Sequence, residues 1–372
     1  MPKKNKIKKK CSHTPEFVER CITVPSRVES TQFFGNQTVP SANIYTRIVG
    51  STSNPVVFFC SDTNFSSDMW RCQEVFVAQQ GFCSVTVDLR GLGRSSKTPA
   101  NPDISSPPTP GTINYVYETF ANDIYCVLNI LGLCKPFVWV GVSTGAGIGI
   151  RYFSLYNNSP FGPKIKQLFL INTSPVLVVP DCSFDPACTA LTCPPDPITG
   201  NQLCFPQALI PESLLQSFNF LIQNDFALFS QTLIDIVATD CPDVIAPVKA
   251  YLTSAINVNV PSITLNLFNT LFRQDLRSIL PTINIPTLVW RGYPQFAPGS
   301  QYIADNIRCA VSVVGTDEGL FPHMTNFTTF NCILWRFLEK MPFFPITTIP
   351  AKQCNVCPLI GPINYASQQC FP

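Results

Sequence analysis

The sequence predicts an α/β protein with a doubly wound, mostly parallel sheet, an inserted helical lid and a Pro- and Cys-rich C-terminal tail. Three observations favour this class. Short, continuous apolar runs, typical of strands buried on both faces, recur along the chain. Segments with helical spacing alternate with these runs, as expected for parallel strands joined by crossover helices. The alternation stops at Pro175 and resumes at Pro286, which indicates an insertion.

The individual elements follow from these patterns. Two or three short strands are expected over residues 33–61, because an alternating segment at 43–50 precedes turn residues and then an apolar run. Helical spacing appears at 69–80, 117–131 and 146–156, between further strands at 83–87, 137–140 and 167–171. Strands at 286–290 and 311–314 and a closing helix at 330–338 complete the series.

Changes in composition divide the chain into five parts. Residues 1–20 form a basic leader that we expect to be disordered. The sheet domain is split into 21–175 and 281–340. Between them, 176–280 combines a Cys- and Pro-rich stretch with a helical lid. The tail, 341–372, holds six prolines and is expected to drape over the surface.

The charge distribution bounds the classes of partner. Six of the first ten residues are lysines, so the net charge of +2 becomes −4 for the rest of the chain. Nucleic-acid binding by the folded body is therefore not expected. The leader is either an address signal or polyanion anchor, or a solvated tail. Charged residues make up only 13%, against about 25% in soluble domains. The surface is therefore either rich in hydroxyl and amide groups or partly covered by a partner, and we favour a protein partner.

Apolar segments give no sign of a secretory signal after the lysines, nor of a transmembrane segment. The expected location is therefore cytoplasmic or virion-associated. The second possibility is included because a lysine leader on a cysteine-rich body resembles proteins of large DNA viruses. The 17 cysteines fit this location poorly, since dense cysteines normally indicate disulfides and secretion.

The cysteines fall into three groups. Small buried thiols are expected in apolar segments, at Cys60, Cys83, Cys126, Cys134 and Cys332. Disulfides are one of two open readings for Cys182, Cys188, Cys193 and Cys204, whose segment has no core of its own. Cys354-x-x-Cys357 with Cys370 lacks the spacing of a second half-site for zinc. No metal and no cofactor are therefore expected.

The motif that carries chemistry is Gly141-Val142-Ser143-Thr144-Gly145, between an expected strand and an expected helix. Gly-x-Ser-x-Gly in this context is a nucleophile elbow, in which the serine occupies a strained turn above the sheet. Small flanking residues allow the strand and the helix to approach closely. The sequence thus predicts a Ser143 hydroxyl that projects above the sheet beside a helix N-terminus.

Around this motif the chain resembles the α/β-hydrolase superfamily, over residues 43–340 with the lid poorly covered. The segment 88–95, Asp-Leu-Arg-Gly-Leu-Gly-Arg-Ser, matches a family turn, and the loop 318–324 is similar to that of small-molecule serine esterases. The resemblance implies that Ser143 is the nucleophile. It also implies that the backbone N–H groups of Asp62 and Thr144 form the oxyanion hole.

The chain departs from this family at the other catalytic positions. The segment 292–298 holds no carboxylate where the acid is expected, and the alternative acid position is Asn172. The histidine position is Leu320. His323 lies three residues further on, and it could reach Ser143 only if the loop refolds, with Asp317 or Glu318 as acid.

Two hypotheses follow from this incomplete triad. The first is a binding or structural protein with weak or no turnover, because a serine without an adjacent base is a poor nucleophile. The alternative is an active, carboxylesterase-like serine hydrolase that acts on a small apolar ester through Ser143 and a displaced His323. In both, a small apolar ligand is expected under the lid.

Overall fold

A central sheet of eight strands organises the part of the chain that the computed structural model describes. This part is residues 15, 17–184, 205, 207–238, 242–315 and 319–339, without the side chains of 184 and 242–245. The strand order is β1-β4-β6-β5-β7-β8-β11-β12. In that order the strands are Phe17–Val24, Ala42–Val49, Cys83–Val87, Val56–Cys60, Phe137–Val142, Ile165–Ile171, Thr287–Arg291 and Ala310–Val314.

The mostly parallel, doubly wound sheet is confirmed. Only β1 with β4 and β4 with β6 pair antiparallel, and the remaining neighbours are parallel. Every residue of β5, β6 and β7 is buried. Their continuous apolar runs are explained by helices on both faces of the sheet, which leave these central strands no solvent-facing side.

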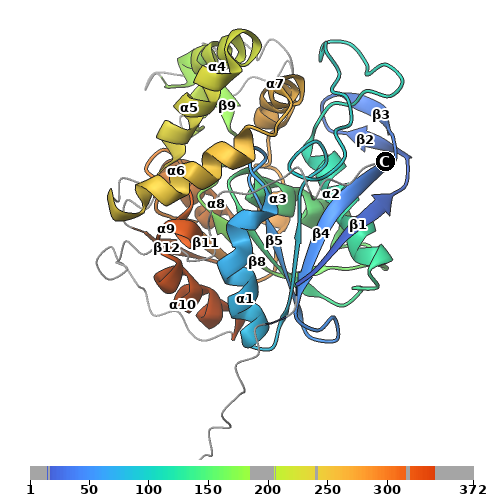
Figure 1. Ribbon diagram of the computed structural model, residues 1–372, viewed down its shortest axis with the longest axis vertical. Helices are drawn as coiled ribbons and strands as arrows, with labels where there is room; N and C mark the ends of the chain where they lie inside the picture. Colours follow the sequence, from blue (N-terminus) through green and yellow to red (C-terminus); the bar gives the residue numbers. More distant parts are fainter. Residues whose placement is uncertain are drawn as a thin grey trace, which may run out of the picture.

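Two pairs of helices cover the two faces (Figure 1). Helix α1 (Arg71–Gln79) packs against α10 (Phe327–Leu338), and α2 (Tyr117–Ile130) packs against α3 (Thr144–Tyr156). The chain runs from β5 through α1 to β6 in one direction across the sheet and returns from β6 through α2 to β7. Right-handed crossovers of opposite direction place α1 and α2 on opposite faces.

The helical insertion between β8 and β11, which we call the lid, has its helices at the top of the view in Figure 1. Helix α4 (Glu212–Asn224) packs on α7 (Pro261–Thr270), and α5 (Phe226–Val237) contacts both α4 and α6 (Pro242–Ile256). Edge-to-face aromatic pairs join Phe218 to Phe229 and to Phe268 within it. The described lid elements are β9 (Val178–Val179), η2 (Asp181–Phe184), β10 (Ile210–Pro211), α4 (Glu212–Asn224), α5 (Phe226–Val237), α6 (Pro242–Ile256), α7 (Pro261–Thr270), η3 (Leu271–Arg273) and η4 (Leu280–Thr282).

Several elements were not predicted from the pattern. Strand β1 begins at Phe17, inside the segment expected to be leader. Strand β2 (Arg27–Thr31) was also not predicted, and it pairs antiparallel with β3 (Gly35–Val39), which lies in the range where two or three strands were expected. Edge and hairpin strands expose one side, so their polar residues hide the strand pattern. Helix α8 (Ala297–Asn306) begins with Ala-Pro-Gly, which reads as a turn in sequence.

The cysteines divide differently from expectation. Cys60 and Cys83 are buried free thiols and Cys126 is half-buried, but Cys134 and Cys332 are exposed. The prediction of buried thiols was wrong for these two because Cys134 follows the end of α2 and Cys332 lies on the solvent side of the amphipathic α10. Cys21, Cys72 and Cys182 take part in disulfides. The other cysteines of the expected disulfide stretch and the Cys354, Cys357 and Cys370 group lie outside the described residues.

Candidate active site

Ser143 stands at the corner between β7 and α3, with φ 52° and ψ −120°. A positive φ at a non-glycine residue is strained and persists only where the surroundings enforce it. The surroundings are tightly packed at Gly145, where an added Cβ would lie 2.5 Å from the backbone oxygens of Cys60 and Ser61. A Cβ on Gly141 would lie 2.5 Å from the Gly145 oxygen. The structure therefore has the geometry expected of a nucleophile elbow.

The loop after β5 carries Asp62 next to this corner. Asp88 anchors the far end of the loop, because its carboxylate accepts hydrogen bonds from the Ser67 N–H at 2.8 Å and from the Ser67 hydroxyl at 2.6 Å. Arg94 donates to the other Asp88 oxygen from its backbone N–H and its Nε, each at 2.8 Å. The expected 88–95 turn thus fixes the loop that holds Asp62.

The side chain of Asp62 lies beside the elbow, next to Thr144, which the resemblance makes an oxyanion donor. Its carboxylate accepts hydrogen bonds from the Thr144 hydroxyl at 3.2 Å and from the Asn64 N–H at 3.0 Å. Burial raises the pKa of Asp62, and the nearby Ser143 hydroxyl and Thr144 N–H offset part of that rise. One of the two expected oxyanion donors therefore faces a carboxylate of the same chain.

Asn172 occupies the alternative acid position and joins three loops. Its side-chain oxygen accepts from the backbone N–H groups of Gly292 at 2.8 Å and Tyr293 at 3.1 Å. Its amide nitrogen donates to the Leu320 carbonyl at 3.0 Å. Asn172 itself has φ 42°, a left-handed conformation that asparagine tolerates better than most residues. In the family that the chain resembles, these loops carry the catalytic acid and histidine. Here a neutral amide connects them by hydrogen bonds.

The structure does not bring His323 to Ser143. The imidazole is fully buried on α9 (Pro322–Thr325) and stacks on Trp70, with ring centroids 3.9 Å apart and planes 17° apart. Neither ring nitrogen has a hydrogen-bond partner among the described residues. Burial lowers the pKa of His323 well below its usual range, so the ring is neutral. The acid candidates Asp317 and Glu318 lie outside the described residues.

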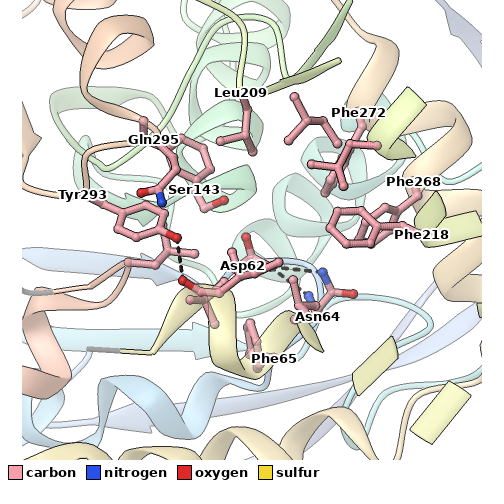
Figure 2. Close-up of a pocket in the computed structure, with 17 residues that line it drawn as sticks. Asp62, Asn64, Phe65, Ser143, Leu209, Phe218, Phe268, Phe272, Tyr293 and Gln295 are labelled. Carbon is pink, nitrogen blue, oxygen red and sulfur yellow. Dashed lines mark hydrogen bonds between the residues drawn. The ribbon is translucent and has the colours of Figure 1, made fainter. Parts of the chain in front are cut away.

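A cavity of about 280 Å³ opens beside Ser143 (Figure 2). This volume is near the lower end of the roughly 300–1,000 Å³ usual for ligand pockets. Its polar end is formed by Asp62, Asn64 and Ser143, and Leu320 contributes an apolar side chain where the resembling family has histidine. The lid supplies most of the remaining wall, from Leu209, Ile210, Leu214, Phe218, Leu233, Ile236, Val237, Phe268 and Phe272.

Comparison with known proteins agrees with this geometry. A family model described as the alpha/beta hydrolase fold matches residues 55–187. An esterase from Exiguobacterium antarcticum and a bromoperoxidase from Bacillus anthracis superpose with TM-scores of 0.63 and 0.65, each at 20% identity over 80% of this chain and 96% of the other. The chain has the α/β-hydrolase fold.

Sequence relatives of this hydrolase-fold chain match it over a shorter span. A bifunctional esterase/perhydrolase from Acinetobacter calcoaceticus is 31% identical over 142 residues, which are 38% of this chain and 45% of that protein. A bifunctional epoxide hydrolase from Sus scrofa is 30% identical over 137 residues, 33% of this chain and 22% of that protein. The match thus spans less than half the length of either relative.

Some residues of the hydrolase-fold site escaped prediction from sequence. Asn64 lies two residues after Asp62, in a loop whose course no periodic pattern describes, and Tyr293 and Gln295 belong to the segment noted only for its lack of acid. Within the described ranges, no group of three or more His, Cys, Asp or Glu side chains is placed to hold a metal ion. No helix in those ranges is long and apolar enough to cross a membrane.

Proposed function

We propose that this hydrolase-fold protein binds a small apolar ligand beneath its lid and turns over esters weakly or not at all. The observation that carries the proposal is the buried Asp62 carboxylate, which stands beside the elbow and accepts a hydrogen bond from the Thr144 hydroxyl at 3.2 Å. Acyl transfer develops negative charge on the substrate oxygen at this point, and catalysis depends on unoccupied donors there. A carboxylate in the same place competes for the donors and repels that charge.

The arrangement at the base position supports the same conclusion. Leu320 lines the cavity where a histidine would accept the serine proton, and His323 is held against Trp70. Loss of one oxyanion donor lowers kcat by about 10²–10³. A serine hydrolase without its base keeps only about 10³–10⁴ over water. Together these losses leave little turnover, whereas the apolar cavity remains suited to binding.

The alternative is an active serine hydrolase that uses Ser143 and a displaced His323 on a small apolar ester. The strained backbone at Ser143 favours it, because strain of this kind is usually retained for function. Likeness to an esterase/perhydrolase and an esterase also agrees with it. This alternative requires His323 to leave its stack on Trp70.

A stable role in a protein assembly is compatible with the binding proposal. The low share of charged residues, 13%, supports a surface partly covered by another protein.

Reaction with a fluorophosphonate probe and with a chromogenic short-chain ester tests the proposed function. The wild-type chain is compared with Ser143→Ala, which removes the nucleophile, and with His323→Phe, which keeps an aromatic ring on Trp70. We expect no labelling and no ester turnover above the Ser143→Ala background. Rapid labelling of Ser143 with turnover that disappears in Ser143→Ala would overturn the proposal. Loss of that activity in His323→Phe as well would favour the displaced-histidine alternative.

A further inference from the structure

Asp62 is exceptional among the buried carboxylates of this protein. Within the described residues, every other buried Asp or Glu has a carboxylate oxygen within 3.6 Å of an arginine nitrogen. These paired carboxylates are Glu29, Asp68, Glu74, Asp88, Glu118 and Asp123. Asp62 is only 4% exposed and has no cationic side chain within ion-pair distance in the same ranges. Buried charges are normally paired, because desolvation without a counter-charge is costly.

Asn64 presents a second group without a partner at the same end of the cavity. It is 3% exposed, and its side-chain oxygen has no hydrogen-bond partner among the described residues. The Asn64 amide nitrogen faces an Asp62 oxygen at 3.5 Å, and Figure 2 shows the two side chains next to each other. That contact places the amide nitrogen on the Asp62 side, so Asn64 offers the carboxylate an amide donor but no positive charge.

The polar end of the cavity therefore presents a carboxylate without a counter-charge. The Ser143 hydroxyl beside it can accept a hydrogen bond as well as donate one. The Tyr293 hydroxyl, which also lines the cavity, already donates to the Ile236 carbonyl at 2.5 Å. A ligand with a carboxylate or phosphate head would meet like charge from Asp62 here. A cationic head would supply the counter-charge that Asp62 lacks.

The walls suit an ammonium group attached to an apolar body. Phe65 lies beside Asp62 at the polar end (Figure 2), and an aromatic ring attracts a nearby cation. Beyond it, Phe218, Phe268 and Phe272 provide an apolar surface. The volume of about 280 Å³ restricts the body to a small group.

We propose that the ligand is a small amine whose ammonium group pairs with Asp62, while its apolar body fills the space beneath the lid. The proposal rests on the proposed binding function and adds the chemistry of the head group. It distinguishes this site from one that binds acyl groups, since an acid of the same size is rejected by charge. The contact of an ammonium with a buried carboxylate gives the amine an advantage of roughly ten- to a hundredfold over an alcohol.

Three probes with one apolar chain and different heads test this inference: n-hexylamine, n-hexanol and hexanoate at neutral pH, measured by titration calorimetry against the full chain. We expect n-hexylamine to bind roughly ten- to a hundredfold more tightly than n-hexanol, and hexanoate to bind most weakly. In Asp62→Asn the preference for the amine over the alcohol should disappear. Asp103→Asn is the matched control, because it removes the same charge from an exposed carboxylate away from the cavity and should leave the order unchanged.

The wild-type order alone decides the inference, so it does not depend on the folding of the Asp62→Asn chain. Hexanoate binding as tightly as n-hexylamine, or equal binding of all three probes, would refute the amine preference and leave apolar binding intact. Binding of none of the three would refute both. An amine preference that survives in a folded Asp62→Asn chain would also refute the assignment to Asp62.

Discussion

The imidazole of His323 lies flat on the indole of Trp70, with the centroids 3.9 Å apart and both ring nitrogens unbonded within the described part of the chain. A histidine in this setting acts as an aromatic core residue and not as a base. Its burial has a consequence for the pH dependence of stability, because the folded protein resists protonation of this ring while the unfolded chain does not.

The stability of the protein should fall below pH 6.5 through His323. In the folded state, burial lowers the pKa of His323 well below its ordinary value of 6.5. The contribution of this residue to stability is therefore present above pH 6.5. It is lost as the pH falls, because the unfolded chain then gains a proton that the folded chain does not bind. The free energy of unfolding should decline by up to about 1.4 kcal/mol per pH unit from this group. Denaturant unfolding of wild type and His323→Phe at several pH values isolates the effect. Parallel curves for the two chains would show that His323 titrates normally.

Replacement of Asn172 by Asp should destabilise the fold despite restoring a carboxyl group at an acid position. The variant keeps the acceptor for Gly292 and Tyr293 but loses the donor to the Leu320 carbonyl at 3.0 Å. A buried carboxylate facing a carbonyl oxygen should cost about 2–4 kcal/mol in unfolding free energy at pH 8.

Acidification should reduce that deficit in Asn172→Asp, because a protonated carboxyl group can donate to Leu320 again. Asn172→Ala serves as the comparison, since it loses the same donor without introducing a charge, and its deficit should not depend on pH. Thermal melts at pH 5 and pH 8 provide the measurement. A deficit of Asn172→Asp that is larger at pH 5 would contradict this account.

The elbow should not accept a methyl group at position 145. A Cβ there would lie 2.5 Å from two backbone oxygens, which cannot move as a flexible side chain can. We expect Gly145→Ala to unfold or to lose at least about 3 kcal/mol in unfolding free energy. Gly111 offers a matched control, because it has φ 87° with open space around its Cβ position. Gly111→Ala should cost only about 1–2 kcal/mol, and equal losses in the two variants would show that crowding at the elbow is unimportant.

The buried arginine of β4 should matter far more than an exposed lysine of the lid. Arg47 is fully buried and pairs with Asp68 at 2.6 Å and Glu74 at 2.7 Å. Arg47→Met leaves both carboxylates without this partner, and we expect a loss of about 3–5 kcal/mol. Lys249→Met breaks the partly exposed pair with Asp235 and should change stability by less than about 1 kcal/mol. Chemical denaturation of the two variants measures the difference, and similar losses would contradict this ranking.

Local patterns in the sequence determined the central elements of the fold. Continuous apolar runs predicted β5, β6 and β7, because strands buried on both faces must be apolar at every position. The spacing of Gly141 and Gly145 about Ser143 predicted the elbow for the same local reason. The edge strand β1 and the hairpin strand β2 were missed because a strand with one solvated side mixes polar residues into its pattern.

The tertiary structure alone decided what surrounds Ser143. Contacts between residues far apart in the sequence set the surroundings of Asp62, the loops that Asn172 joins and the position of His323. Sequence shows that a histidine and an acid are absent from their expected positions, since those positions follow from motif spacing. Only the packed structure shows that a carboxylate stands beside the serine hydroxyl, because side-chain direction and burial are set by packing and not by spacing along the chain.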